Sequence, residues 1–325
     1  MKAVSLLVIG SLVATCFADD RAEKLMAKYL RGDYNVNIVA IVKETSEGNG
    51  TQRTKIQRSK DGKIRETVLA PLHLQGEYVD DGREYKQYLP DDGYMLISPS
   101  QALSHDIKLR SPLIEKNYTL KMDGSSRIIG RRCVTVVATS RFNEVPILRY
   151  HFDEATGYPM AMETVANDGS IVNSFEVTDI KFPAKLDDST FVIEPVAGVK
   201  IVHYDETNCL SRLSDAEPKL GFKPIVPKDI PFGFEIQRIS VSTDSRYRIL
   251  CLKLTDGLQR ATVYEWTYVQ NEKITTGEAS DNKIWKGLKI TVVADLGSSL
   301  RQSFLQPFLV RANPQFPGIV TSIGI

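Results

Sequence analysis

The amino-acid sequence predicts a mostly β fold of the α+β class, arranged as two domains. At roughly 100–200 residues per domain, the 325 residues suffice for two domains with cores of their own. Strand-like segments separated by short turns recur along most of the chain, whereas few segments have helical spacing. The 41 basic and 40 acidic side chains leave a net charge of +1, so no overall field draws the protein to nucleic acid or an anionic membrane.

The chain after residue 18 opens on a predicted helix and then changes its period. Apolar residues from Ala22 to Leu30 recur at helical spacing, and Asp19 and Asp20 suit the positive end of a helix dipole. From Tyr34 onward the pattern becomes strand-like, with an Asp-Gly turn at 61–62 that is typical of a hairpin. The predicted strands of this region are 36–42, 51–58, 63–69, 84–89 and 94–97.

The middle of the chain repeats this pattern, with predicted strands at 132–138, 147–152, 158–165 and 170–180. The turns between them are short, which favours antiparallel neighbours over parallel strands joined by helices. A sheet with so many strands and few helices is expected to curl. The curled sheet would leave one concave apolar face for a helix or a ligand.

A boundary between two domains is expected where strand patterning gives way to a linker. Segment 187–193 closes the first unit, and the chain from about 194 to 212 has the character of a linker. We predict a first domain at 19–200, a linker at 201–213 and a second domain at 214–325. A final helix at 299–306 is expected to end at Pro307.

The first 18 residues have the pattern of a secretory signal peptide. One cation, a short apolar core and a small residue before Asp19 predict cleavage after Ala18 and an extracytoplasmic, periplasmic protein. The alternative is a lipoprotein signal in which Cys16 is acylated, although Thr15 departs from the usual small residue at that position. No other apolar run approaches the ~20 residues that a membrane helix needs.

The sequence contains no motif that predicts catalysis, a metal or a cofactor. A phosphate-binding glycine loop, a nucleophile elbow and a zinc-binding His-Glu-x-x-His helix are all absent, and the histidines lack metal-ligand spacing. The three cysteines beyond the signal, Cys133, Cys209 and Cys251, allow one disulfide and fit buried thiols better than redox chemistry. We predict a non-enzymatic protein without catalytic residues, with an exported hydrolase as the enzymatic alternative.

Several short motifs, in one sequence order, resemble the MucB/RseB family of periplasmic sigma-E regulatory proteins. In the first domain they are segments 88–91, 152–160 and 168–180, which are also similar to the LolA and LolB lipoprotein carriers. In the second domain they are segments 230–234, 254–258, 261–264 and 290–294, which favour MucB/RseB. The resemblance extends over most of residues 20–310.

The resemblance implies both a fold and a function. The first domain would be an unclosed antiparallel β-barrel over helices with an apolar cavity, and the second a smaller α+β domain. The protein would bind the extracytoplasmic domain of an anti-sigma factor and sense envelope lipid, thereby regulating a sigma-factor stress response. The alternative function is that of a periplasmic lipid or lipoprotein carrier of the LolA/LolB type.

Alternation along the predicted strands suggests which residues line the apolar concavity. The candidates for lipid contact are Val39, Ile41, Val68, Leu96, Val136 and Met160, for each of which core packing is the competing interpretation. No residue is matched to a contact with an anti-sigma factor. The sequence leaves open the identity of the protein partner and lipid, and whether the chain forms an oligomer.

Overall fold

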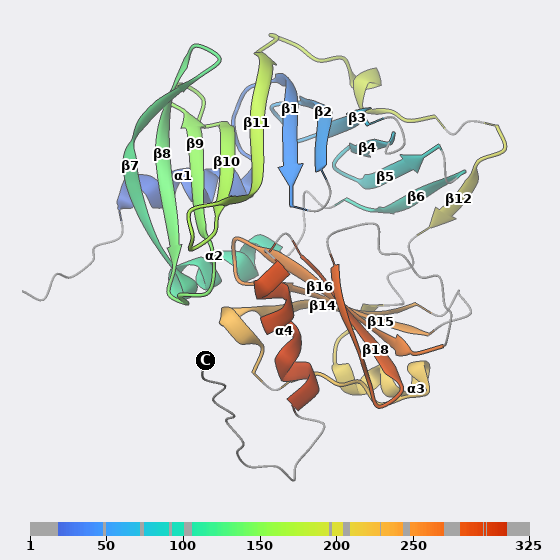
Figure 1. Ribbon diagram of the computed structural model, residues 1–325. Helices are drawn as coiled ribbons and strands as arrows, with labels where there is room; N and C mark the ends of the chain where they lie inside the picture. The colour runs from blue at the N-terminus through green and yellow to red at the C-terminus, as the bar shows by residue number, and fades with distance from the viewer. Residues whose placement is uncertain are drawn as a thin grey trace, which may run out of the picture.

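The computed structural model describes residues 19–310, except for 48–49, 72–74, 91–92, 101–105, 195–196, 204–208, 228, 243–247, 270–279, 295 and 297. The predicted signal peptide and Cys16 lie outside the described residues. The described chain forms two sheets, one above the other in Figure 1. None of its helices is both long and apolar enough to cross a membrane.

The first sheet has the strand order β12-β6-β5-β4-β3-β2-β1-β11-β10-β9-β8-β7 in the described part of the chain. Its outer strands β12 and β7 do not pair with each other, so the barrel is unclosed, as predicted. Neighbouring strands of this sheet are antiparallel, apart from β12 and β6, which are parallel. The strands are β1 (Ile38–Ser46), β2 (Gly50–Arg58), β3 (Ile64–Ala70), β4 (Glu77–Asp80), β5 (Glu84–Leu89), β6 (Tyr94–Pro99), β7 (Tyr118–Ile128), β8 (Arg131–Ser140), β9 (Ile147–Asp153), β10 (Pro159–Val165), β11 (Ile171–Lys181) and β12 (Lys200–His203).

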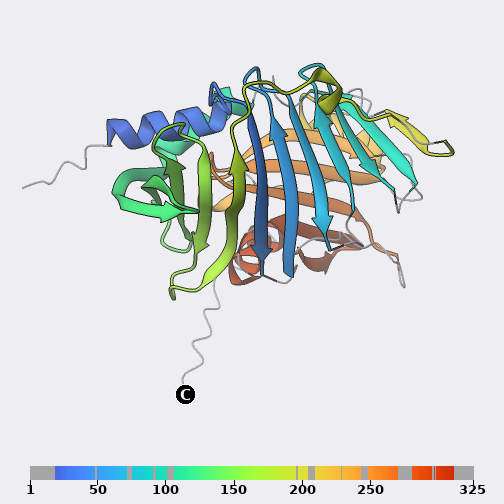
Figure 2. The same ribbon diagram turned by 90° about the horizontal axis from the view of Figure 1, so that it is seen from above.

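Helix α1 (Asp20–Arg31) begins and ends at capping residues that the sequence supplies. The Asp19 carboxylate accepts a hydrogen bond from the Arg21 amide, and Gly32 adopts the left-handed conformation that ends the helix. The apolar side of the helix, with Ala22 and Met26 buried, packs on the same core as Tyr150 and Phe152 of β9. Helix α1 thus covers one part of the sheet (Figure 2).

Two further segments cover the first sheet. Helix α2 (Asp106–Asn117) lies between the ends of strands β7 to β9 and the second sheet (Figure 1). After β11 the chain crosses over the first strands toward β12 (Figure 2) and includes the 3-10 turn η2 (Asp188–Phe191). Phe191 of this crossing segment is buried in a small core with Val79 and Met95.

The second sheet has the order β13-β14-β15-β16-β18-β17 among the described residues, and α4 packs on it. Phe304 of α4 contacts Phe234 edge to face, with ring centroids 5.2 Å apart. The elements are β13 (Cys209–Leu210), η4 (Leu213–Asp215), α3 (Glu217–Leu220), η5 (Pro231–Gly233), β14 (Glu235–Ser242), β15 (Ile249–Thr255), β16 (Arg260–Thr267), β17 (Ser280–Trp285), β18 (Leu288–Ala294) and α4 (Ser298–Val310).

The last helix and the predicted linker differ from the sequence expectations. Helix α4 does not end at Pro307 but continues to Val310, because Phe304 and Phe308, on either side of the proline, are fully buried in the core of the second domain. The predicted linker at 201–213 contains strand residues at both ends. His203 completes β12 of the first sheet, and Cys209 begins β13 of the second.

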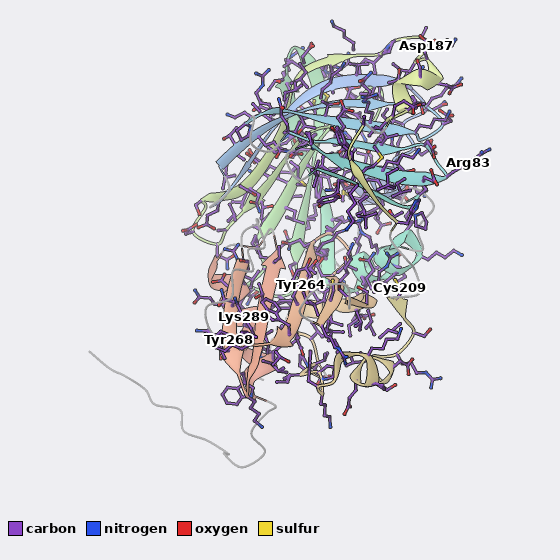
Figure 3. The ribbon with its side chains drawn as sticks, turned by 90° about the vertical axis from the view of Figure 1, so that its right-hand side faces the viewer. Arg83, Asp187, Cys209, Tyr264, Tyr268 and Lys289 are labelled. Carbon is purple, nitrogen blue, oxygen red and sulfur yellow. The ribbon has the colours of Figure 1, made fainter. Side chains whose placement is uncertain are left out.

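The cysteines of the described chain form no disulfide. Cys209 and Cys251 both pair with Ser240, from opposite sides of β14. Two strand spacings of about 4.8 Å separate their backbones, which exceeds the reach of a disulfide. Cys209 lies on the side of the molecule shown in Figure 3, together with Tyr264 and Lys289.

A buried carboxyl in the second domain makes its stability dependent on pH. Glu265 is fully buried, one of its oxygens accepts the Ile225 amide, and its other oxygen has no partner among the described residues. Burial raises the pKa of Glu265 to about 8 from 4.5. Because the folded state binds this proton more tightly, the stabilising contribution of protonation is complete below pH 4.5 and is lost as pH rises through 8.

We therefore expect Glu265→Gln to flatten the pH profile of unfolding and to raise the melting temperature of the second domain at pH 8. Thermal unfolding at pH 5 and pH 8.5 measures the effect. Glu217→Gln, at an exposed position of α3, is the matched control and should retain the wild-type profile. A wild-type pH slope in Glu265→Gln would contradict the prediction.

Candidate functional site

A cavity of about 470 Å³ lies between α1 and the strands β1, β2, β3, β10 and β11. Its volume is in the usual range of about 300–1,000 Å³ for small-molecule sites. The lining residues are Tyr29, Tyr34, Glu44, Thr45, Ser46, Ile56, Arg58, Ile64, Glu66, Tyr150, Tyr158, Pro159, Met162, Thr164, Asn173, Ser174 and Phe175. This lining combines aromatic and aliphatic surface with a few charged and polar groups, which suits an amphipathic ligand.

Aromatic rings form one wall of this cavity. Tyr29 of α1 lies 5.3 Å from Tyr150 of β9, and Tyr34 contacts Tyr158 edge to face at 5.1 Å, as measured between ring centroids. Burial raises the pKa values of Tyr34 and Tyr158 well above their usual range. These phenols therefore stay neutral at physiological pH, and the wall carries no negative charge from them.

Two charged side chains of opposite sign enter the same cavity from neighbouring strands. Arg58 donates a hydrogen bond of 2.7 Å to the Gly32 carbonyl, and its guanidinium lies 5.5 Å from the Tyr34 ring centroid. Burial raises the pKa of the Glu66 carboxyl, and the positive charge of Arg58 opposes that rise. The cavity lining thus contains the Arg58 cation, the Glu66 carboxyl with its raised pKa, and a second carboxyl at Glu44.

A second cavity of about 260 Å³ lies where the two domains meet. It shares Tyr29, Tyr150, Met162 and Thr164 with the first cavity, so the two are neighbours separated by these side chains. Its other lining residues are Arg110, Leu148, Leu258, Gln259 and Arg260. The second domain therefore contributes directly to a wall next to the first-domain cavity.

The six residues suggested by the sequence as cavity candidates do not line either of these cavities. Val136 and Met160 are fully buried in the core, and Val68 is 5% exposed. Leu96 is half-buried on β6. Val39 and Ile41 point to the face opposite that of the buried Ile38, Ala40 and Val42, because side chains alternate along a strand. Their contact with lipid stays a prediction.

The cavity candidates suggested by the sequence do not include the polar and aromatic residues that line the cavity. Arg58 and Glu66 each lie two residues after an apolar residue of the same strand, Ile56 and Ile64. This spacing indicated that each charged residue shares a face with its apolar neighbour. Charged residues in strands are more often solvated, so this signal was weak. In the described residues no three His, Cys, Asp or Glu side chains come together as metal ligands would.

The first domain is thus an open antiparallel sheet that encloses a cavity, and the second domain contributes to a neighbouring cavity. Residues 42–194 match the family model of the MucB/RseB N-terminal domain. This match confirms the resemblance to the MucB/RseB family found in the sequence. No curated protein matches the chain.

Solved structures extend this likeness over both domains. A crystal structure of MucB has a TM-score of 0.60 and 18% identity, and the match covers 89% of this chain and 98% of that one. The MucA/MucB complex of Pseudomonas aeruginosa matches with a TM-score of 0.61 and 18% identity, over 89% and 97% of the two chains. At this identity the matches show a common fold.

A LolA superfamily protein from Nitrosomonas europaea also matches, with a TM-score of 0.27 and 10% identity over 54% of this chain and 98% of that one. A TM-score of 0.27 supports no conclusion about function.

The interactions of Arg58 predict a measurable effect on stability. Arg58→Met should lower the free energy of unfolding by about 1–3 kcal/mol, because the Gly32 carbonyl loses a charged donor. It should also raise the pKa of Glu66 further, because the opposing positive charge is removed. Urea unfolding and carboxyl ¹³C NMR measure the two effects.

The control is Lys55→Met, three residues earlier on β2 and outside the cavity lining. It should leave the Glu66 titration unchanged. Equal effects of the two substitutions would contradict the role given to Arg58.

Proposed function

We propose that this protein is a non-enzymatic, extracytoplasmic regulator that binds the extracytoplasmic domain of an anti-sigma factor. The observation that carries the proposal is the match of both domains, over 89% of the chain, to MucB in a structure described as the MucA/MucB complex. The family match of residues 42–194 supports it independently. The predicted signal at residues 1–18 supports a periplasmic location, with the chain either free or attached through an acylated Cys16.

Binding to the anti-sigma factor is tested with both purified partners. Isothermal titration calorimetry of the full chain with the extracytoplasmic domain of the anti-sigma factor encoded beside its gene should give saturable binding. The matched control is the extracytoplasmic domain of an unrelated anti-sigma factor, which should give none. Absence of binding while circular dichroism shows both partners folded would reject this function.

We further propose that the 470 Å³ cavity of the first domain takes an acyl lipid, which makes the regulator responsive to envelope lipid. Apolar lining such as Ile56 and Phe175 suits a hydrocarbon chain, whose transfer from water gains about 0.8 kcal/mol per buried methylene. A ligand changes partner binding only through its different affinities for two states of the protein. The shared wall between the two cavities offers a physical route for such coupling to the second domain.

A pair of matched substitutions tests the location of the lipid site. Ile56→Ser places a hydroxyl in the cavity wall and removes apolar contact, so the affinity for a dansyl-labelled fatty acid should fall about tenfold. Ile41→Ser makes the same change on the neighbouring strand β1, at a residue that does not line the cavity, and should leave the affinity unchanged. Fluorescence titration measures both affinities. A loss of affinity in Ile41→Ser alone would instead favour the lipid site suggested by the sequence.

A lipid or lipoprotein carrier of the LolA/LolB type is the second candidate, favoured by the cavity of the first domain. A carrier should copurify with acyl chains that mass spectrometry detects in an organic extract, and should deliver them to an acceptor without binding an anti-sigma factor. The regulator should bind the anti-sigma factor in the absence of lipid. The calorimetry described above therefore separates the two functions.

A further inference from the structure

The turn between β15 and β16 forms a deeply buried polar contact with the first domain. Thr255 and Asp256 in this turn are at most 1% exposed. The Asp256 carboxylate holds the turn by accepting the amides of Leu258 and Gln259 at 3.0 and 2.7 Å. The turn is therefore a rigid unit that the second domain presents to the first.

Four hydrogen bonds join this turn to the end of α2 and the start of β7. The Tyr118 hydroxyl donates to Asp256 Oδ2 at 2.5 Å and accepts from the Gln259 side chain at 3.1 Å. Asn117 Nδ2 donates to the Asp256 carbonyl at 2.8 Å, and Arg110 Nε donates to the Gly257 carbonyl at 2.8 Å. Separation of the domains would break all four.

The fit at Gly257 shows how closely the domains approach. Its φ is +110°, and a Cβ atom at this position would lie 2.8 Å from the backbone nitrogen of Ile114 and 3.0 Å from the Arg110 carbonyl oxygen. The apolar side chain of Leu258 packs on the first-domain core beside the cavity wall. Water is therefore excluded from the carboxyl of Asp256 only while the domains are docked.

We propose that this contact is a proton-sensitive latch, in which uptake of one proton by Asp256 strengthens the docking of the second domain on the first. The proposal does not depend on the function proposed above, because the latch is built within one chain. It makes the arrangement of the two domains responsive to acidification.

Burial, and not the charges around the latch, favours protonation of Asp256. Burial raises the pKa of Asp256 to about 6, while the hydrogen bonds from Tyr118 and the two amides oppose the rise. Tyr118 and Tyr150 face it, and burial raises their pKa values so far that both phenols stay neutral. The remaining charged groups nearby are the Arg110 and Arg260 guanidiniums and the Lys116–Glu235 ion pair, which lies at the exposed rim.

The direction of the effect follows from the two states of Asp256. In separated domains the carboxyl is in water and its pKa returns toward the ordinary 3.8, whereas in docked domains it is about 6. The docked state thus binds the proton more tightly, and docking strengthens as pH falls through 6. Between pH 7.5 and pH 4.5 the docking equilibrium should change by about 25-fold.

Hydrogen exchange of the full chain measures the latch directly. Protection factors for the peptide spanning 255–260, corrected for the intrinsic pH dependence of exchange, should rise about 25-fold from pH 7.5 to 4.5. The peptide spanning 261–267 of β16 reports the stability of the second domain and serves as internal reference. In the Asp256→Asn variant, whose side chain is neutral and of equal size, the peptide spanning 255–260 should be highly protected from exchange at both pH values.

Three further variants make the test specific. Asp215→Asn removes an exposed carboxyl of the second domain, and Glu235→Gln removes the carboxyl at the rim of the interface. In both variants the protection of peptide 255–260 should keep its wild-type dependence on pH. Tyr118→Phe removes the hydroxyl that lowers the pKa of Asp256, so the rise in protection should shift to higher pH. Carboxyl ¹³C NMR of wild-type Asp256 should give a midpoint near 6.

The latch would be overturned by a wild-type protection ratio that does not change with pH, by an Asp256 midpoint near 4, or by an Asp256→Asn variant that keeps the wild-type slope. If Asp256→Asn fails to fold, the NMR midpoint and the shift in Tyr118→Phe decide the question.

Discussion

An open, curved sheet of this size has a concave apolar face that must be covered, and the rest of the structure depends on this constraint. Helix α1 covers part of it by burying Ala22 and Met26 against the rings of Tyr150 and Phe152. Helix α2 and Leu258 of the second domain cover a further part. What remains uncovered between α1 and strands β1 to β3 is the cavity, so the cavity arises because the covering helix does not fill the curved face.

The contact between the two domains combines two kinds of chemistry. Each core is built from aliphatic and aromatic side chains, whereas the contact between the domains joins apolar packing, as at Leu258, with a polar network around Asp256 and Tyr118. A buried polar network stabilises an interface only in the geometry that satisfies its members. It therefore specifies one docked arrangement, and in the proposed latch its stability depends on the protonation of Asp256.

Much of the fold could be predicted from local patterns. The helical spacing after Asp19 predicted α1, and the Asp-Gly turn at 61–62 predicted the hairpin of β2 and β3, in which Gly62 has a φ of +97°. The prediction that the last helix ends at Pro307 was wrong, because burial of Phe308 outweighs the loss of the hydrogen bond that the proline removes. Residues 201–203 were expected at the start of a linker, yet they belong to β12 because a free strand edge at β6 was available to pair with them.

The sequence by itself determined the strand periodicity, the turns, the order of the domain motifs and the family of the first domain. These are local or ordered properties, fixed by side-chain alternation and by turn chemistry. Only the tertiary structure decided which face of β1 is concave, and that Arg58 and Glu66 share a cavity with Tyr34. It alone decided that Tyr118 meets Asp256, 138 residues away. Alternation assigns residues to the same face but does not say what lies opposite, because that depends on how distant segments pack.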